Sequence, residues 1–205
     1  MPRFAGQLAI VAILFTSLLL IVPPGLGESV GDILLHAAAT VVVAVVVQSF
    51  RAPLKKPHST TSRYLLLAGA GVAWGTASWL LMRAVMFLVT YIWSQSAQQY
   101  FPIYSLDSIR LWIAIPVQLL VGVREELVFR GFLQPKLMAV SGSTLGAIAG
   151  TATLFAAAHL PLGIGIAGFA LIGGVLFGGI RTVHNSVLPA GIAHGVYNCL
   201  VLILM

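Results

Sequence analysis

Long apolar runs recur along this chain, and they limit what it can fold into. Each run is close to the ~20 residues that an α-helix needs to cross the hydrocarbon core of a bilayer. Hydrophobic residues make up 59% of the sequence and charged residues 8%, which leaves too little polar surface for a water-soluble domain. The sequence therefore predicts an integral membrane protein with about seven transmembrane helices, over residues 5–22, 33–50, 64–93, 108–134, 144–159, 163–180 and 187–205.

The predicted fold class is an all-α polytopic membrane protein, a bundle of helices around a polar catalytic cavity within the membrane. These spans and their loops use up the 205 residues, so we expect a single transmembrane domain over residues 1–205. The run 64–93 is longer than a span needs, so it is either one long tilted helix or a span followed by an interfacial piece. Cys199 is the single cysteine and lies in the last run, so no disulfide framework is expected.

The charged residues predict an orientation in the membrane. The loop 51–63 carries four fixed positive charges, and Arg3, Lys136 and Arg181 are expected on the same side. The positive-inside rule puts this side, with the N-terminus, in the cytoplasm. Arg3 before an apolar run also fits a cleaved signal peptide, but the run 5–22 is long for one and no A-x-A cleavage site follows. The net charge of +6 does not predict nucleic-acid binding, because the basic residues lie in loops rather than in one patch with interleaved aromatic residues.

Several glycines are spaced for close packing of helices. Gly146 with Gly150, and Gly174 with Gly178, form small-xxx-small pairs that let two helix backbones approach closely in lipid. The stretch 163–168 formally matches the dinucleotide fingerprint GxGxxG. It lacks a preceding strand and a following acidic residue, so helix packing is the preferred interpretation here too.

Two adjacent carboxylates, Glu125 and Glu126, lie between apolar stretches, where a charge is costly and rarely kept without a function. On a helix, Glu126 and Arg130 are four residues apart with the acid first, which favours an ion pair, whereas Glu125 points about 100° away. This spacing predicts that Glu126 and Arg130 support each other and that Glu125 is available as a general base. In the alternative, both glutamates lie at the cytoplasmic interface and snorkel together with Arg124.

Two further helices carry polar groups at helical spacing. Phe155 and His159 share one helix face, and His194 and Asn198 share another. A lone histidine near the end of a span is usually a satisfied interfacial residue, but polar groups on three apolar helices favour a common site with Glu125. A carboxylate and an imidazole can deprotonate a water, while a second imidazole and a carboxamide can donate hydrogen bonds to an oxyanion. This set fits the hydrolysis of an amide.

The same groups leave a zinc site open as an alternative. Glu125, His159 and His194 offer the oxygen and nitrogen ligands that zinc takes, with one position left for water. The motif HExxH is absent, so the usual spacing of zinc proteases gives no support. No serine or cysteine nucleophile is evident either, because the residues 141–143 are typical of a turn.

The predicted spans also give a depth for each of these groups. At ~1.5 Å per residue, His194 lies roughly 10–15 Å into its span from the loop 181–187, and Glu125, counted back from Lys136, lies at a similar depth. His159 lies ~20 Å from the start of its run at Thr144. We therefore expect the helix 144–159 to be tilted or to begin late in the membrane.

The three polar segments together form an ordered set of motifs: Glu125-Glu126-x-x-x-Arg130, Phe155-x-x-x-His159 and His194-x-x-x-Asn198. They resemble the three motifs of the CAAX-processing and bacteriocin-processing (CPBP, or Abi) family of intramembrane proteases, which includes the type II CAAX prenyl endopeptidases. The resemblance covers residues 125–198, within a motif-bearing core of about 108–205. The earlier runs share only their hydropathy with the family.

This resemblance implies an intramembrane endopeptidase. Glu125 with His159 would activate the attacking water, and His194 with Asn198 would stabilise the oxyanion. The supporting residues would be Glu126, Arg130 and Phe155. No cofactor is expected, and zinc held by Glu125, His159 and His194 is the alternative.

The resemblance also implies a class of substrate and a location. The substrate would be a membrane-associated protein or peptide, and both prenylated chains and chains with a C-terminal sorting segment are candidates. Many members of the family are prokaryotic, so we expect a multi-pass protein of a prokaryotic cytoplasmic membrane, with the bilayer and the substrate as its partners and no nucleic acid.

A rival interpretation is a membrane protein without catalytic activity. It would be an immunity factor that binds a bacteriocin or its receptor, or a proton-coupled transporter that uses Glu125 and the histidines as a relay. Against the transporter, the polar residues cluster in the C-terminal half of the chain without an inverted counterpart in the first half.

Overall fold

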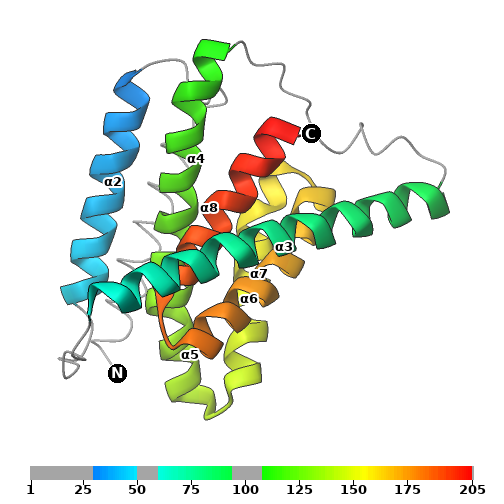
Figure 1. Cartoon of the computed structure of the whole chain (residues 1–205). Coiled ribbons are helices and arrows are strands. Elements are labelled where there is room, and N and C mark those ends of the chain that lie inside the picture. The colour runs from blue at the N-terminus through cyan, green and yellow to red at the C-terminus, as the bar shows by residue number, and fades with distance from the viewer. Residues whose placement is uncertain (1–29, 50–59, 94–107, 205) are drawn as a thin grey trace.

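The computed structural model describes residues 30–49, 60–93 and 108–204, and in these residues it contains helices and no strands (Figure 1). The predicted all-α fold class is therefore confirmed for this part of the chain. The predicted span 5–22 and the basic loop up to residue 59 lie outside the described residues. In chain order the helices are α2 (Val30–Ser49), α3 (Thr61–Trp93), α4 (Ser108–Val128), η2 (Phe129–Leu133), α5 (Gln134–Ser141), α6 (Thr144–His159), η3 (Leu160–Leu162), α7 (Ile164–His184) and α8 (Val187–Leu204).

Five of these helices are long and apolar enough to cross a membrane, namely α2, α3, α6 with its short extension, α7 and α8. This pattern makes the chain a multi-pass integral membrane protein. The predicted count of about seven is not reached within the described residues. Part of the reason is α4, which carries Arg110, Arg124, Glu125 and Glu126 and is therefore less apolar than a typical span.

The helix that carries the two glutamates does not end where the sequence indicated. α4 continues through η2, a single π-helical turn, directly into α5, so the predicted end at residue 134 is wrong. Lys136 lies within α5 rather than in a loop, and Arg181 lies within α7. A π-turn keeps the backbone hydrogen-bonded while it shifts the register, and such turns are frequent at functional sites. Hydropathy alone therefore did not reveal it.

The helix finally ends at the turn that the sequence did predict. Gly142 takes a left-handed backbone conformation with φ 65°, and the Ser143 hydroxyl caps α6 by accepting a hydrogen bond of 3.0 Å from the Gly146 amide. Gly142 follows Glu125 and precedes His159 by the same number of residues, 17 in each case. Both side chains therefore lie at about the same height above the turn, roughly 25 Å at the rise of a helix.

This symmetry corrects the depths expected from the sequence. A count from Lys136 underestimates the depth of Glu125, because the helix runs on to Ser141 and Glu125 lies as far from the turn as His159 does. The helices α4 to α5 and the helix α6 form a hairpin around the turn at Gly142. The two residues come to one level because α5 lengthens the first arm of this hairpin. A tilted or late-starting α6 is not needed to explain it.

Close contacts between glycines and neighbouring backbones hold the central helices together. α8 packs against α3, α4 and α7, and a Cβ atom at Gly122 of α4 would lie 2.5 Å from the Gly195 amide nitrogen of α8. Gly174 of α7 approaches Ala152 of α6 in the same way, with 2.8 Å from its Cβ position to the Ala152 Cα. The predicted role of Gly174 in helix packing is therefore confirmed.

The stretch 163–168 does not serve the close packing that the sequence suggested. Gly163 lies in the turn between α6 and α7, where its φ of 117° requires glycine. A Cβ atom at Gly168 would have no neighbouring atom within 4 Å. These glycines belong to a turn and to an open helix face.

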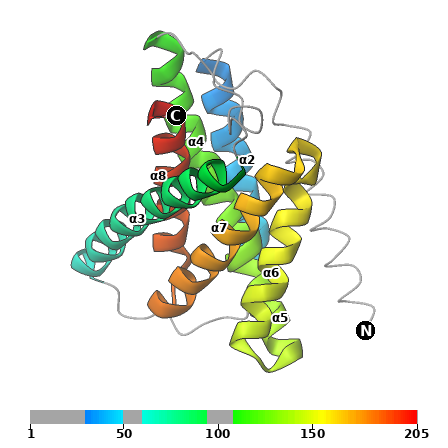
Figure 2. The ribbon, with the colours of Figure 1, turned by 90° about the vertical axis from the view of Figure 1, so that its right-hand side faces the viewer.

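The outer helices α2 and α3 have different orientations. α2 packs on α4 and runs in the same direction, while α3 crosses over α8 obliquely to both (Figures 1 and 2). α3 is a single helix of 33 residues. Its length of about 50 Å exceeds the ~30 Å hydrocarbon core, so a strong tilt accommodates it. Of the two predicted forms of this run, the single long helix is the one observed.

Candidate active site

The ion pair predicted from helical spacing is present in the core of the bundle. The Arg130 guanidinium donates a hydrogen bond from Nη1 to Glu126 Oε1 at 2.9 Å, and both side chains are fully buried. Arg130 Nη2 donates a second bond, of 2.8 Å, to the backbone carbonyl of Gly174 on α7. Because Gly174 has no side chain, α7 packs closely and this carbonyl lies within hydrogen-bonding distance of Arg130. The buried arginine therefore also links α7 to the helix that carries the glutamates.

Three aromatic rings surround the buried guanidinium. The Arg130 Cζ atom lies 4.9 Å from the centroid of Phe155, 5.7 Å from Phe129 and 5.9 Å from Phe177. A planar, weakly hydrated guanidinium is suited to such a cation–π environment. Phe155 was expected to support the site, whereas Phe177 was missed, because a phenylalanine within an apolar helix gives no signal in the sequence.

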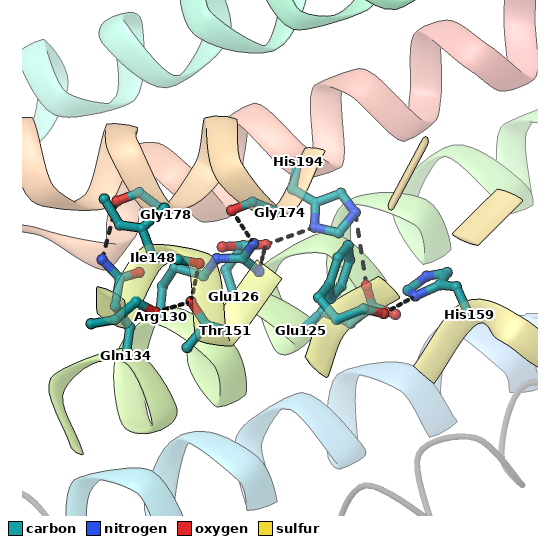
Figure 3. Close-up of polar contacts among 12 residues, drawn as sticks. Glu125, Glu126, Arg130, Gln134, Ile148, Thr151, His159, Gly174, Gly178 and His194 are labelled. Carbon is teal, nitrogen blue, oxygen red and sulfur yellow. Dashed lines mark hydrogen bonds and ion pairs between the residues drawn. The ribbon is translucent and has the colours of Figure 1, made fainter. Parts of the chain in front are cut away.

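His194 on α8 joins the two glutamates of α4 (Figure 3). Its Nδ1 atom lies 3.0 Å from Glu126 Oε1, and its Nε2 atom lies 3.8 Å from Glu125 Oε2. The ring stacks on Phe177 with centroids 4.6 Å apart, and the edge contact with Phe155 spans 5.7 Å. Phe177 and His194 are equally far from the short α7–α8 turn, which brings the two rings to one level. His194 is therefore held by two aromatic contacts, one stacked and one edge-on, and at Nδ1.

These contacts define the tautomer of His194. Glu126 is ionised in its pair with Arg130 and can only accept hydrogen bonds, so Nδ1 of His194 must carry a proton and donate it. The Nε2 atom then faces Glu125 with a lone pair in the neutral ring, and with a second proton in the imidazolium. This is how a carboxylate usually orients a functional histidine.

His159 is anchored in a similar way at the end of α6. Its Nδ1 atom lies 2.8 Å from the Phe155 carbonyl oxygen, which can only accept, so Nδ1 carries the proton and the Nε2 lone pair is available. The ring contacts Phe155 with centroids 4.5 Å apart. In Figure 3 the imidazoles of His159 and His194 lie on either side of the Glu125 carboxylate. Phe155 thus contacts both histidines and the buried arginine.

Glu125 differs from its neighbours in exposure. Its side chain is 23% exposed, whereas Glu126 is fully buried and Arg124 is 1% exposed. The alternative in which both glutamates snorkel with Arg124 at the interface is wrong, because Glu126 and Arg124 are enclosed by protein. The predicted division holds in the contacts: Glu126 pairs with Arg130, and Glu125 retains an accessible carboxylate.

Asn198 follows His194 by one helical turn on α8 and is half-buried. Its side chain makes no hydrogen bond with any of the described residues. Its carboxamide therefore keeps its donors, and its expected place beside the reacting group stays a prediction.

The sequence also missed Gln134, which extends the polar contacts along α7. Its Nε2 atom donates to the Gly178 carbonyl at 3.2 Å and to the Thr182 hydroxyl at 3.0 Å. Gln134 follows Arg130 by four residues, and Gly178 follows Gly174 by four. The two helices thus meet along a ladder of side-chain donors and backbone acceptors.

The groups named for the zinc alternative do not form a ready cluster. Among the described residues, no three His, Cys, Asp or Glu side chains lie close enough together to hold a metal ion. Zinc binding by Glu125, His159 and His194 would therefore require these side chains to move toward one another.

These features define a polytopic helical membrane protein with a charged cluster buried between helices. Comparison with known families adds a more specific assignment. Residues 107–200 match the sequence model described as type II CAAX prenyl endopeptidase Rce1-like. This part of the chain is therefore similar to the Rce1-like endopeptidases, consistent with the predicted resemblance to the CPBP family, and the match contains every motif residue from Glu125 to Asn198. No curated protein and no solved structure matched the chain.

Proposed function

We propose that this chain is an intramembrane endopeptidase that hydrolyses a peptide bond in a membrane-associated protein or peptide. The observation that carries the proposal is the placement of His194, which contacts both Glu125 and Glu126 across 68 residues of sequence. The family match supports a peptidase, and it does not favour a binding protein or a transporter. Candidate substrates are prenylated chains and chains with a C-terminal sorting segment.

The proposed reaction begins with a water between Glu125 and His159. The Glu125 carboxylate takes one proton, the Nε2 lone pair of His159 orients the water through a hydrogen bond, and the resulting hydroxide attacks the carbonyl carbon. The C–N bond then breaks as Glu125 returns the proton to the leaving nitrogen. The hydroxyl group of the water thereby becomes part of the new carboxyl group, and its proton becomes part of the new amine.

The tautomer of His194 refines its expected role at the oxyanion. Because Nδ1 donates to Glu126, the Nε2 atom can donate to an oxyanion only when the ring is an imidazolium. Glu125 and Glu126 are both placed to stabilise that charge. The Asn198 carboxamide would provide the second donor, and each such donor typically contributes about 10²–10³ in rate.

No metal takes part in this proposal. Glu125 accepts and returns the proton, His159 orients the water and His194 donates to the oxyanion, and the contacts described above already fix one nitrogen of each ring. Zinc at Glu125, His159 and His194 is the alternative, and it would supply a metal-activated water in place of the general base.

The test compares membrane peptidomes from cells that express the wild-type protein or Glu125→Gln. We expect at least one peptide to disappear with Glu125→Gln, and the same peptide to be produced by the purified wild-type protein in proteoliposomes. His194→Ala should behave like Glu125→Gln, while His184→Ala is the control, since His184 is a half-buried histidine that accepts a hydrogen bond of 3.1 Å from Trp74, away from the two glutamates. Identical peptidomes in all four strains would refute the proposed activity.

A further inference from the structure

A buried pair links α2, which lies outside the family match, to the residue that precedes Glu125. Arg124 Nη1 lies 2.9 Å from His36 Nδ1. His36 is 2% exposed and Arg124 is 1% exposed, so neither side chain reaches the surface. A buried polar pair between distant segments is costly unless it is satisfied, which makes this contact a candidate for a specific task.

The chemistry of the pair fixes the state of His36. A guanidinium has donors and no acceptor, so the Nδ1 atom of His36 must accept and is unprotonated. This is the reverse of His159 and His194, whose Nδ1 atoms donate. The Nε atom of Arg124 is buried without a hydrogen-bond partner among the described residues. His36 therefore provides a hydrogen-bond acceptor to the buried Arg124 guanidinium, whose Nε donor is left without one.

The charges around Glu125 show why the position of Arg124 matters. Glu126 and Arg130 are in direct contact and neutralise each other. Arg124, the residue next to Glu125, is then the remaining cation of the cluster. The field at the Glu125 carboxylate depends on where the Arg124 guanidinium lies, because charges interact strongly over short distances away from bulk water.

Other contacts already dock α2 on α4. The Thr40 hydroxyl lies within 3.5 Å of the Leu120 carbonyl, and Val43 and Val47 belong to the buried cluster that contains Phe129 and Phe155. The Thr40 hydroxyl also donates to the His36 backbone carbonyl at 2.7 Å, but none of these contacts involves the His36 imidazole or Arg124. The histidine is therefore not needed simply to hold the two helices together.

We propose that His36 is a positioning residue for Glu125: it accepts a hydrogen bond from Arg124 and so fixes the positive charge beside the catalytic carboxylate. This inference rests on the proposed peptidase activity. It makes α2 part of the catalytic apparatus, although α2 has no motif and lies outside residues 107–200.

The experiment compares two replacements of His36 in the full chain, in proteoliposomes, with the peptide identified from the peptidome comparison. His36→Asn keeps an acceptor, since its Oδ1 can occupy the place of Nδ1, while His36→Leu removes the acceptor at similar size. We expect His36→Leu to lower kcat by roughly 10- to 100-fold, as loss of an outer partner of a catalytic site does, with KM changed by less than about twofold. His36→Asn should recover most of kcat.

Thr40→Val is the matched control, because it removes a polar contact between α2 and α4 and a hydrogen bond to the His36 backbone carbonyl while it leaves the His36 imidazole and Arg124 in place. It should retain wild-type kcat. Equal losses in His36→Leu, His36→Asn and Thr40→Val would overturn the proposal and assign His36 to helix docking alone. Wild-type kcat in His36→Leu would overturn it as well.

A double-mutant cycle keeps this test separate from the test of the peptidase itself. His36→Leu should lower the unfolding midpoint in detergent when Arg124 is present and should have little effect in an Arg124→Met background. Additive effects would refute the pairing. A wild-type protein without peptidase activity would overturn the proposed function and the catalytic half of this inference, while the cycle would still decide whether His36 holds Arg124.

Discussion

At the scale of single residues, two adjacent glutamates have different environments because a helix turns by 100° per residue. Glu126 faces Arg130 and His194 in the protein interior, and Glu125 faces His194 from a more accessible position. The sequence was sufficient to predict this division, because the spacing of four residues identifies the ion pair. The motifs also grouped Glu125 with His159 and His194, but they did not predict that Glu126 contacts His194 or that Arg130 contacts the Gly174 carbonyl.

The residues that the sequence missed are those with no distinctive chemistry or spacing of their own. Phe177 stacks on His194, and the Gly174 carbonyl accepts from Arg130. A phenylalanine and a glycine within an apolar helix carry no signal until the fold brings them to a polar group. The same is true of Gln134, whose amide reaches the Gly178 carbonyl.

The division between the glutamates predicts different effects for Glu125→Gln and Arg130→Ala. Glu125→Gln should lower kcat by roughly 10²–10⁴-fold with the unfolding midpoint unchanged, because it removes a general base and no close ion pair. Arg130→Ala should lower both activity and stability, the latter by about 3–5 kcal/mol, because Glu126 becomes an unpaired buried charge. Turnover and thermal unfolding of the purified variants in detergent measure both effects. Equal loss of folded protein in the two variants would show that Glu125 is structural.

The metal-free mechanism predicts that activity survives strong chelation. Prolonged treatment with EDTA or phenanthroline in detergent should leave turnover largely intact, because the proposed reaction requires only Glu125 and the histidines as proton acceptors and donors. Metal analysis of the purified protein provides the control. Stoichiometric zinc, with activity lost on its removal and restored on its return, would instead establish the zinc mechanism.

At the scale of helices, the site depends on two hairpins whose arms have matching lengths. The turn at Gly142 brings Glu125 and His159 to one level, and the turn between α7 and α8 does the same for Phe177 and His194. Hydropathy gave the existence of these helices but misplaced the end of the first arm. The π-turn and α5 lengthen that arm beyond α4. Their mixture of apolar and polar residues resembles the sequence at the end of a span, so hydropathy does not show that the helix continues.

The contact between α4 and α8 predicts a large effect of a single methyl group at Gly122. A Cβ atom there would lie 2.5 Å from the Gly195 amide nitrogen, so Gly122→Ala must push α8 away and move His194 from the glutamates. Overpacking of this kind costs roughly 1–3 kcal/mol, and we expect activity to be lost with it. Gly168→Ala is the matched control, since its Cβ atom would meet nothing within 4 Å.

The measurements are the unfolding midpoint and the turnover of both variants in detergent. Gly168→Ala should be neutral or slightly stabilising, because alanine is a better helix former than glycine by up to about 1 kcal/mol. Wild-type activity in Gly122→Ala would mean that α8 can shift without disturbing the site.

At the scale of the whole molecule, the described helices place basic residues at one end of the bundle. In Figure 1, α5 lies at the lower end and the end of α7 and the start of α3 lie in the lower half, and these segments carry Lys136, Arg181 and Arg63. Although Lys136 and Arg181 lie within helices and not in loops, they still fall on one side, as the sequence predicted. The positive-inside rule then predicts that this end faces the cytoplasm.

This orientation can be measured at the turn between α5 and α6. Ser141 is exposed at the basic end, so we expect Ser141→Cys, in a Cys199→Ala background, to react with a membrane-impermeant thiol reagent in inside-out vesicles and not in right-side-out ones. Leu162→Cys, in the exposed turn between α6 and α7 at the other end of the hairpin, should lack this preference for inside-out vesicles. Glu125 and His159 lie about 25 Å from the turn at Gly142, between α5 and α6. A water that reaches them from the cytoplasm must therefore cross most of the membrane. Labelling of Ser141→Cys only in right-side-out vesicles would reverse the topology, and the substrates would then have to be sought on the outer side of the membrane.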